Sequence, residues 1–209
     1  MSKHNTREQF GFLDNRLIQY VVAITQEGLH SIKTRKKDVC LMRIGLHKAY
    51  INVDWEFLQL ILHKIGFGVK MVDWIMTCNT TVNYTVIING IPSDFFKHLR
   101  GLRHGYALSP LHLLLVIYGL SRCINDDRSK GVIIGCRIYK NIHITHSMFI
   151  DNFLFIGHIS LVEQRAFHNI LTIFGTALAL YRNKGKSVLI LDSKEKGIIN
   201  QIENIYEVD

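Results

Sequence analysis

The sequence predicts an α+β domain, an antiparallel sheet with helices on one face, and three observations lead to this fold class. Short apolar runs alternate irregularly with segments whose apolar residues recur at helical spacing. Most strand-like runs are joined by tight turns, which connect antiparallel rather than parallel strands. Hydrophobic residues make up 48% and charged residues 20% of the 209 residues, which is typical of a globular core and not of a disordered chain.

The first part of the chain reads as a helix, a strand and two further helices. Residues 16–33 have apolar residues at helical spacing, and residues 39–46 are a continuous apolar run of the length of a buried strand. Asp54 is placed as the N-cap of the next helix, and Gly66 is placed to end it. Residues 69–79 continue as a second helix.

The rest of the chain alternates hairpins with helices. The expected elements are a hairpin over 83–99 that turns at Asn-Gly, a helix over 111–124, paired short strands over 131–145, a second hairpin over 145–157, a helix over 161–178 and a strand over 187–191. We expect this strand to close the ordered part. One domain over residues 5–193, followed by a C-terminal tail of residues 194–209, is predicted because no linker-like stretch interrupts the chain.

Charge and cysteine content narrow the functional classes. The net charge is +8, which favours an anionic partner, nucleic acid first, although many soluble domains are simply basic. The four cysteines lie far apart, which argues against a zinc site and against a disulfide framework. The first residues lack the apolar core of a signal peptide, and the longest apolar run is about half a membrane span, so an intracellular protein without membrane contact is expected.

Five motifs follow one another along the chain. They are QFGFLDNRLI (9–18), IGLHKAYINVDWEFL (44–58), VIINGIPSDFFKHLRGLRHGYALSPL (86–111), THSMFIDNFLFIG (145–157) and ALYRNKGKS (179–187). In this order and spacing they resemble the reverse transcriptase domain of LINE-type, non-LTR retrotransposons, with plant members nearest in character. The resemblance covers nearly the whole chain. It implies a polymerase palm-type antiparallel sheet with part of the fingers, and an RNA-directed DNA polymerase activity that uses RNA template, DNA primer and Mg²⁺.

The metal site implied by the resemblance is incomplete. The family's reaction uses two Mg²⁺ ions held by carboxylates from neighbouring strands. Gly45 stands where the family has its first metal-binding Asp, and Ile51 replaces the Asp after the aromatic residue. At the tip of the second hairpin, Asp151 matches one metal-binding Asp and Asn152 replaces the other. An Asp-Asn pair is also a common turn, but within this register it indicates a degenerate metal site and an inactive polymerase.

The resemblance also implies nucleotide and template contacts. The aromatic ring of Tyr50 corresponds to the one that packs under the incoming sugar, although a core aromatic would look the same. Lys186 matches a lysine implicated in protonating the pyrophosphate leaving group, and a solvated loop lysine is an equally good account. The remaining expected nucleotide or template contacts, which a surface turn with solvated arginines would also explain, are Arg16, Arg100, Gly101, Arg103, Gly105 and Ser109.

Three functions follow from these motifs. The first is a reverse transcriptase domain that has lost its activity, a pseudoenzyme, because Gly45 and Asn152 replace metal-binding residues. The second is a polymerase that remains active through an unrecognised ligand. The third is a non-catalytic module that binds nucleic acid through its basic groove, with no metal dependence and no obligate protein partner.

Overall fold

The structure, a computed structural model, describes residues 18–35, 38–46, 48–103, 105–139, 142–149, 152–178, 183–192 and 195–206. Its helices are α1 (Ile18–Arg35), α2 (Ala49–Asn52), α3 (Trp55–Ile65), α4 (Val69–Thr80), α5 (Ser109–Ser129), α6 (Leu161–Leu178), α7 (Lys196–Tyr206) and the 3₁₀ turn η1 (Lys184–Lys186). Its strands are β1 (Val39–Gly45), β2 (Asn83–Tyr84), β3 (Ile87–Ile88), β4 (Ile91–Pro92), β5 (Phe96–Lys97), β6 (Cys136–Tyr139), β7 (Ile142–Ile144), β8 (His146–Phe149), β9 (Asn152–His158) and β10 (Val188–Asp192).

The central sheet has four strands in the order β10-β1-β9-β8, and every neighbouring pair is antiparallel. β1 is the continuous apolar run predicted as a buried strand, and it lies inside the sheet, between β9 and β10. Every residue of β1 except Arg43 is buried, so its sequence shows no regular apolar–polar alternation. β8 and β9 form the hairpin predicted over residues 145–157.

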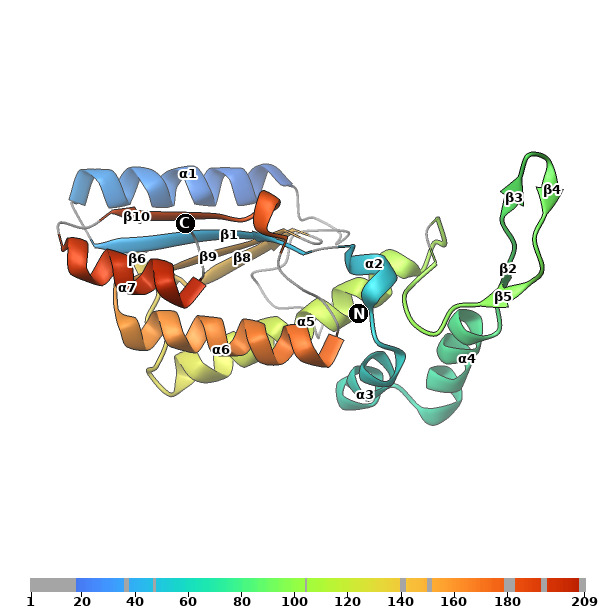
Figure 1. The fold of residues 1–209 in the computed structure, drawn as a ribbon. Helices are drawn as coiled ribbons and strands as arrows, with labels where there is room; N and C mark the ends of the chain where they lie inside the picture. Colours follow the sequence, from blue (N-terminus) through green and yellow to red (C-terminus); the bar gives the residue numbers. More distant parts are fainter. Residues whose placement is uncertain are drawn as a thin grey trace.

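Helices α5 and α6 cover one face of this sheet (Figure 1). Met42 of β1 and Phe155 of β9 point into the main core on this side, where Phe167 of α6 packs edge-to-face on Phe155 with ring centroids 5.2 Å apart. The predicted α+β fold with an antiparallel sheet is confirmed. Helix α1 adds a layer on the opposite face, where its residue Leu29 packs on a smaller cluster that includes Leu41 and Ile156.

The hairpin of residues 83–97 projects away from the sheet as a two-stranded arm (Figure 1). Its tip is the predicted Asn-Gly turn, with Asn89 at φ 50° and Gly90 at φ 84°. Both residues of such a turn need positive φ, which Asn and Gly adopt at the least steric cost. The arm is formed by two short ladders, β2 with β5 and β3 with β4, in place of one continuous pair of strands.

Helix α3 begins and ends as predicted. The Asp54 side chain accepts a hydrogen bond of 2.9 Å from the Phe57 backbone N–H, and Gly66 closes the helix in the left-handed conformation. The expectation that the ordered part of the chain ends with the strand near residue 191 was wrong. Residues 196–206 form α7, and its residues Ile202 and Tyr206 are buried in the main core. The amphipathic spacing of its apolar residues was present in the sequence and was overlooked.

Candidate active site

The candidate active site lies at one end of β1 and β9. Gly45, the last residue of β1, stands directly opposite Asn152, the first residue of β9, in the antiparallel register. Asn152 also pairs with Phe149 across the β8–β9 hairpin. Two positions separated by 107 residues, both singled out by the sequence motifs, are therefore cross-strand neighbours. Side chains at two directly opposite positions would leave the sheet at the same place, as a shared metal site would require.

The segment that carries Lys186 closes over Gly45. The Asn183 backbone N–H donates a 2.9 Å hydrogen bond to the Gly45 carbonyl, so the start of η1 is fixed to the end of β1. A Cβ atom built on Gly45 would lie 2.9 Å from the Cβ of Lys186 and 3.5 Å from its Cδ. Gly45 and Lys186 are thus in direct contact, and the contact is as close as it is because residue 45 has no side chain.

Gly45 and Asn152 do not fit the two-cation centre that the family resemblance implies. Mg²⁺ prefers oxygen ligands, and two adjacent ions need several carboxylates to balance their charge. Gly45 supplies no side-chain oxygen, and Asn152 supplies a neutral amide oxygen. Asp151 lies outside the described residues. Within the described ranges, no three His, Cys, Asp or Glu side chains come close enough together to hold a metal ion.

Tyr50 lies on α2, the short helix that follows this end of β1. The chain leaves β1, passes through Lys48 in the left-handed conformation (φ 48°) and enters α2, which carries Tyr50. Tyr50 is half-buried and packs against the main core. Its backbone carbonyl accepts a hydrogen bond from the Leu102 N–H, which joins α2 to the basic loop of residues 100–105.

Gly101 fixes the basic loop against α2. It adopts φ +93°, and a Cβ at this position would collide with the backbone carbonyl of Ile51, so glycine is required for the close approach. The Gly101 N–H donates to the Val53 carbonyl over 2.7 Å, and the Trp55 indole N–H donates to the Gly101 carbonyl over 2.7 Å. Sequence analysis did not identify Trp55 as an anchor, because nothing local marks a contact between residues 46 positions apart.

The two arginines of this loop have different surroundings. Arg100 is exposed, whereas Arg103 is half-buried and places its guanidinium 5.2 Å from the centroid of the Tyr106 ring. A hydrogen bond to Cys78 raises the pKa of the Tyr106 hydroxyl, and the positive charge of Arg103 acts in the opposite direction. Gly105 is exposed at φ +77°, a backbone conformation suited to a tight turn.

Ser109 begins α5 and is buried at 1% exposure, with no hydrogen-bond partner for its hydroxyl among the described residues.

The structure brings several of the predicted site residues together in two groups. One consists of Gly45, Asn152 and Lys186 at the strand end, and the other of Tyr50 and Gly101 where α2 meets the basic loop. Arg16, like Asp151, lies outside the described residues.

Comparison with known proteins identifies a family and similar folds. The chain matches the family described as reverse transcriptase (RNA-dependent DNA polymerase) over residues 1–197. Apo telomerase from Candida tropicalis, truncated from its C-terminal domain, has a similar fold, with a TM-score of 0.63 at 12% identity over 90% of this chain and 37% of that chain. Telomerase from Candida albicans in complex with a TWJ fragment of telomeric RNA gives a TM-score of 0.63 at 12% identity, over 91% of this chain and 32% of that chain.

The fold is that of a polymerase, with an antiparallel sheet backed by helices. The family match covers residues 1–197 of 209, so the chain belongs to the reverse transcriptase (RNA-dependent DNA polymerase) family. The predicted resemblance to a reverse transcriptase domain is thereby confirmed. In the described part of the chain, no helix has the length and apolar character needed to cross a membrane.

Proposed function

We propose that this chain is the reverse transcriptase domain of a plant-like, LINE-type non-LTR retroelement in which nucleotidyl transfer has been lost. One observation carries the proposal: the two residues that face each other across the ends of β1 and β9 are Gly45 and Asn152. Both stand where the motifs of the family have a metal-binding carboxylate. The pairing supports the view that two substitutions fall in one site and act together.

The missing carboxylates explain the loss of activity through charge. Two Mg²⁺ ions concentrate positive charge at the primer end and the triphosphate, and the protein must compensate it. Replacing one carboxylate by hydrogen and another by a neutral amide removes two negative charges from that site. Each tenfold loss of rate corresponds to about 1.4 kcal/mol of barrier, and we expect a loss of several decades.

Primer extension on an RNA template with Mg²⁺ tests this proposal. The native chain is compared with Asn152→Asp, with Gly45→Asp plus Asn152→Asp, and with Gly45→Ala plus Asn152→Asp. The last variant is the matched control, because it introduces the same Cβ beside Lys186 without a carboxylate. We expect extension only from the variant with both aspartates, and circular dichroism establishes that all four chains are folded.

Extension by the native chain would overturn the proposed inactivity. Extension by the Gly45→Ala control would show that the carboxylate at residue 45 is not required. If a folded Gly45→Asp plus Asn152→Asp chain does not extend the primer, the two substitutions are not the sole cause of the loss of activity.

A second candidate function is nucleic-acid binding without catalysis. Exposed Arg100 and half-buried Arg103 lie on a loop held rigidly by Gly101, and the chain carries a net charge of +8. Phosphate binding by such a surface weakens steeply as salt concentration rises. We expect the Arg100→Ala plus Arg103→Ala chain to bind RNA more weakly and with a smaller salt dependence, equally with Mg²⁺ or EDTA. Binding that is insensitive to salt would exclude this function.

A further inference from the structure

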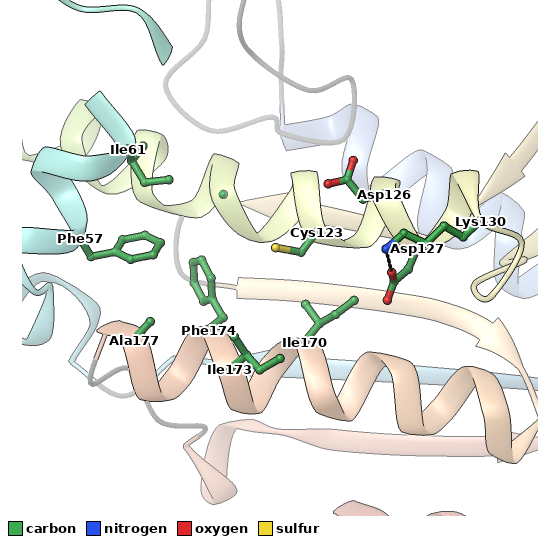
Figure 2. Close-up of a pocket in the computed structure, with 11 residues that line it drawn as sticks. Phe57, Ile61, Cys123, Asp126, Asp127, Lys130, Ile170, Ile173, Phe174 and Ala177 are labelled. Atoms are coloured by element: carbon green, nitrogen blue, oxygen red, sulfur yellow. Dashed lines mark hydrogen bonds and ion pairs between the residues drawn. The ribbon is translucent and has the colours of Figure 1, made fainter. Parts of the chain in front are cut away.

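A groove between α3, α5 and α6 forms a pocket away from the candidate active site, and none of its lining residues belongs to that site (Figure 2). Its volume is about 440 Å³, which is in the range of pockets that hold small organic molecules. The α5 side of the groove is one stripe of the helix, with residues 119, 123, 126, 127 and 130 at successive turns. The groove is therefore built on rigid helices and not on loops.

One end of the groove is apolar and aromatic. The rings of Phe57 and Phe174 meet edge to face, with centroids 5.9 Å apart and an interplanar angle of 85°. Gly119 lies beside them, and a Cβ there would be 3.2 Å from Ile61 Cδ1 and 3.7 Å from an atom of each ring. Because residue 119 has no side chain, these apolar side chains of α3 and α6 can lie close against α5 at this end of the groove. Ile170 of α6 extends the apolar floor.

The other end of the groove is acidic. Asp127 pairs with Lys130 at 2.9 Å, as the dashed line in Figure 2 marks. Asp126 also lines the groove, and its carboxylate makes no hydrogen bond or ion pair with another side chain in the described part of the chain. Two carboxylates and one ammonium leave one net negative charge there. The C-terminal end of α5, which closes at Ser129, adds the partial negative charge of the helix dipole.

The Cys123 thiol lies between these two ends (Figure 2). Cys123 keeps access to solvent, but the partial burial of its thiol in the groove raises its pKa, and the negative charges of Asp126 and Asp127 raise the pKa further. Both effects disfavour an anion in the groove, and the carboxylates favour a cation.

We propose that this groove is a binding site for a small amphiphilic cation. An aromatic or branched aliphatic body lies against Phe57, Phe174 and Ile170, and a protonated amine lies at Asp126 and Asp127. The apolar end and the acidic end of the groove match the two parts of such a molecule, whereas a neutral ligand leaves the acidic end unused. The site is independent of nucleotide chemistry at Gly45 and Asn152, so the proposal does not depend on the function proposed above.

Three probes of the same shape test the charge preference. These are 4-phenylbutylammonium, 4-phenylbutanol and 4-phenylbutyrate, each added to the full chain during labelling with a maleimide. Cys123 and Cys78 are exposed, whereas Cys40 and Cys136 are buried, so Cys78 is an internal control for labelling. We expect the ammonium to slow labelling of Cys123 and to leave Cys78 unchanged. The alcohol is expected to protect less and the carboxylate least.

Two variants locate the site. Asp126→Asn is expected to weaken the protection by the ammonium about three- to fivefold, the scale of an exposed ion pair, and to leave the effect of the alcohol unchanged. Ile173→Ser removes an apolar wall of the groove, and Val162→Ser on the same helix is the matched control, since their exposures are 69% and 67%. Of these two, only Ile173→Ser is expected to weaken the protection of Cys123 by the ammonium.

Three results would overturn the proposal. Equal protection of Cys123 and Cys78 would indicate non-specific adsorption. Equal protection of Cys123 by all three probes would exclude a cation site. The absence of any protection at millimolar ammonium would show that the groove does not bind this class of ligand.

Discussion

At the scale of single residues, His146 shows how a buried imidazole makes stability depend on pH. It is 1% exposed, and its two ring nitrogens lie 2.8 Å from the hydroxyls of Ser121 and Thr145. Each hydroxyl can donate or accept, so the two hydroxyls can satisfy the ring in either protonation state, and burial is what disfavours its charged form. Burial, with a smaller contribution from the charge of Arg128, lowers the pKa of His146 to about 3.

This pKa predicts a loss of stability in mild acid. The unfolded chain takes up a proton near pH 6.5, whereas the folded chain holds His146 neutral, so the unfolded state binds more protons as the pH falls below 6.5. The contribution of neutral His146 to the free energy of unfolding is fully present above pH 6.5 and decreases toward pH 3. We expect the free energy of unfolding to fall by about 2 kcal/mol from this group between pH 7.5 and pH 5. Buried His112, with a pKa lowered to about 4, adds a loss of the same sign.

Urea unfolding at pH 7.5 and pH 5 measures the effect. His146→Gln is expected to reduce the pH dependence, because glutamine does not titrate. His63→Gln, at an exposed position of α3, is the matched control for the substitution itself. An unchanged pH dependence in the His146→Gln chain would contradict the assignment of the proton to this residue.

Gly45 is the second residue whose environment predicts a measurable effect. Because a Cβ there lies 2.9 Å from the Cβ of Lys186, which is not the flexible end of that side chain, Gly45→Ala forces the backbone of η1 or β1 to move. We expect a loss of about 1–3 kcal/mol in the free energy of unfolding. Gly197→Ala is the matched control, since a Cβ there meets no atom within 4 Å.

A double-mutant cycle with Lys186→Gly isolates this contact. Removing the Lys186 side chain is expected to make Gly45→Ala nearly neutral, with a coupling of about 1–2 kcal/mol between the two changes. If the two changes in the free energy of unfolding are additive, the destabilisation by Gly45→Ala does not arise from contact with the Lys186 side chain.

At the scale of elements, local signals predicted most of the fold. The apolar run of β1, the Asp54 cap of α3 and the Asn89-Gly90 turn of the arm are each specified by neighbouring residues, and each was confirmed. The contact of Gly45 with Lys186 was not predictable, because it joins positions 141 residues apart through the register of a sheet. The motifs predicted Gly45, Asn152 and Lys186 as site residues, and only the fold shows that they lie together at one strand end.

Helix α7 was overlooked because short helices owe their stability to tertiary contacts more than to their own propensity. Ile202 is fully buried, and the Tyr206 hydroxyl donates to the Gln164 backbone carbonyl over 2.9 Å. We expect Ile202→Ala to lower the free energy of unfolding by about 2–4 kcal/mol. Ile190→Ala on half-exposed β10 is the control, expected to cost less than about 1 kcal/mol. Equal losses in urea unfolding would show that α7 contributes no more than a surface strand.

At the scale of the whole molecule, apolar surface is distributed unevenly. The sheet and its helices enclose the main core, whereas the arm projects from it with large apolar side chains in solvent (Figure 1). Ile87 is 70%, Ile91 71% and Phe95 76% exposed, and residues 84–93 carry no charge. A two-stranded ribbon also leaves backbone N–H and C=O groups open along its edges.

This surface predicts association between copies of the chain. Uncharged segments of high β propensity with free edges pair readily, and Pro92 blocks a backbone N–H of β4 only. We expect the native chain to form concentration-dependent oligomers in sedimentation velocity, and the Ile87→Lys plus Ile91→Lys chain to stay monomeric. The thermal midpoint is expected to stay the same, because both side chains are exposed. Val162→Lys on α6, equally exposed outside the arm, is expected to leave association unchanged, and a native chain that is monomeric at all concentrations would contradict this role of the arm.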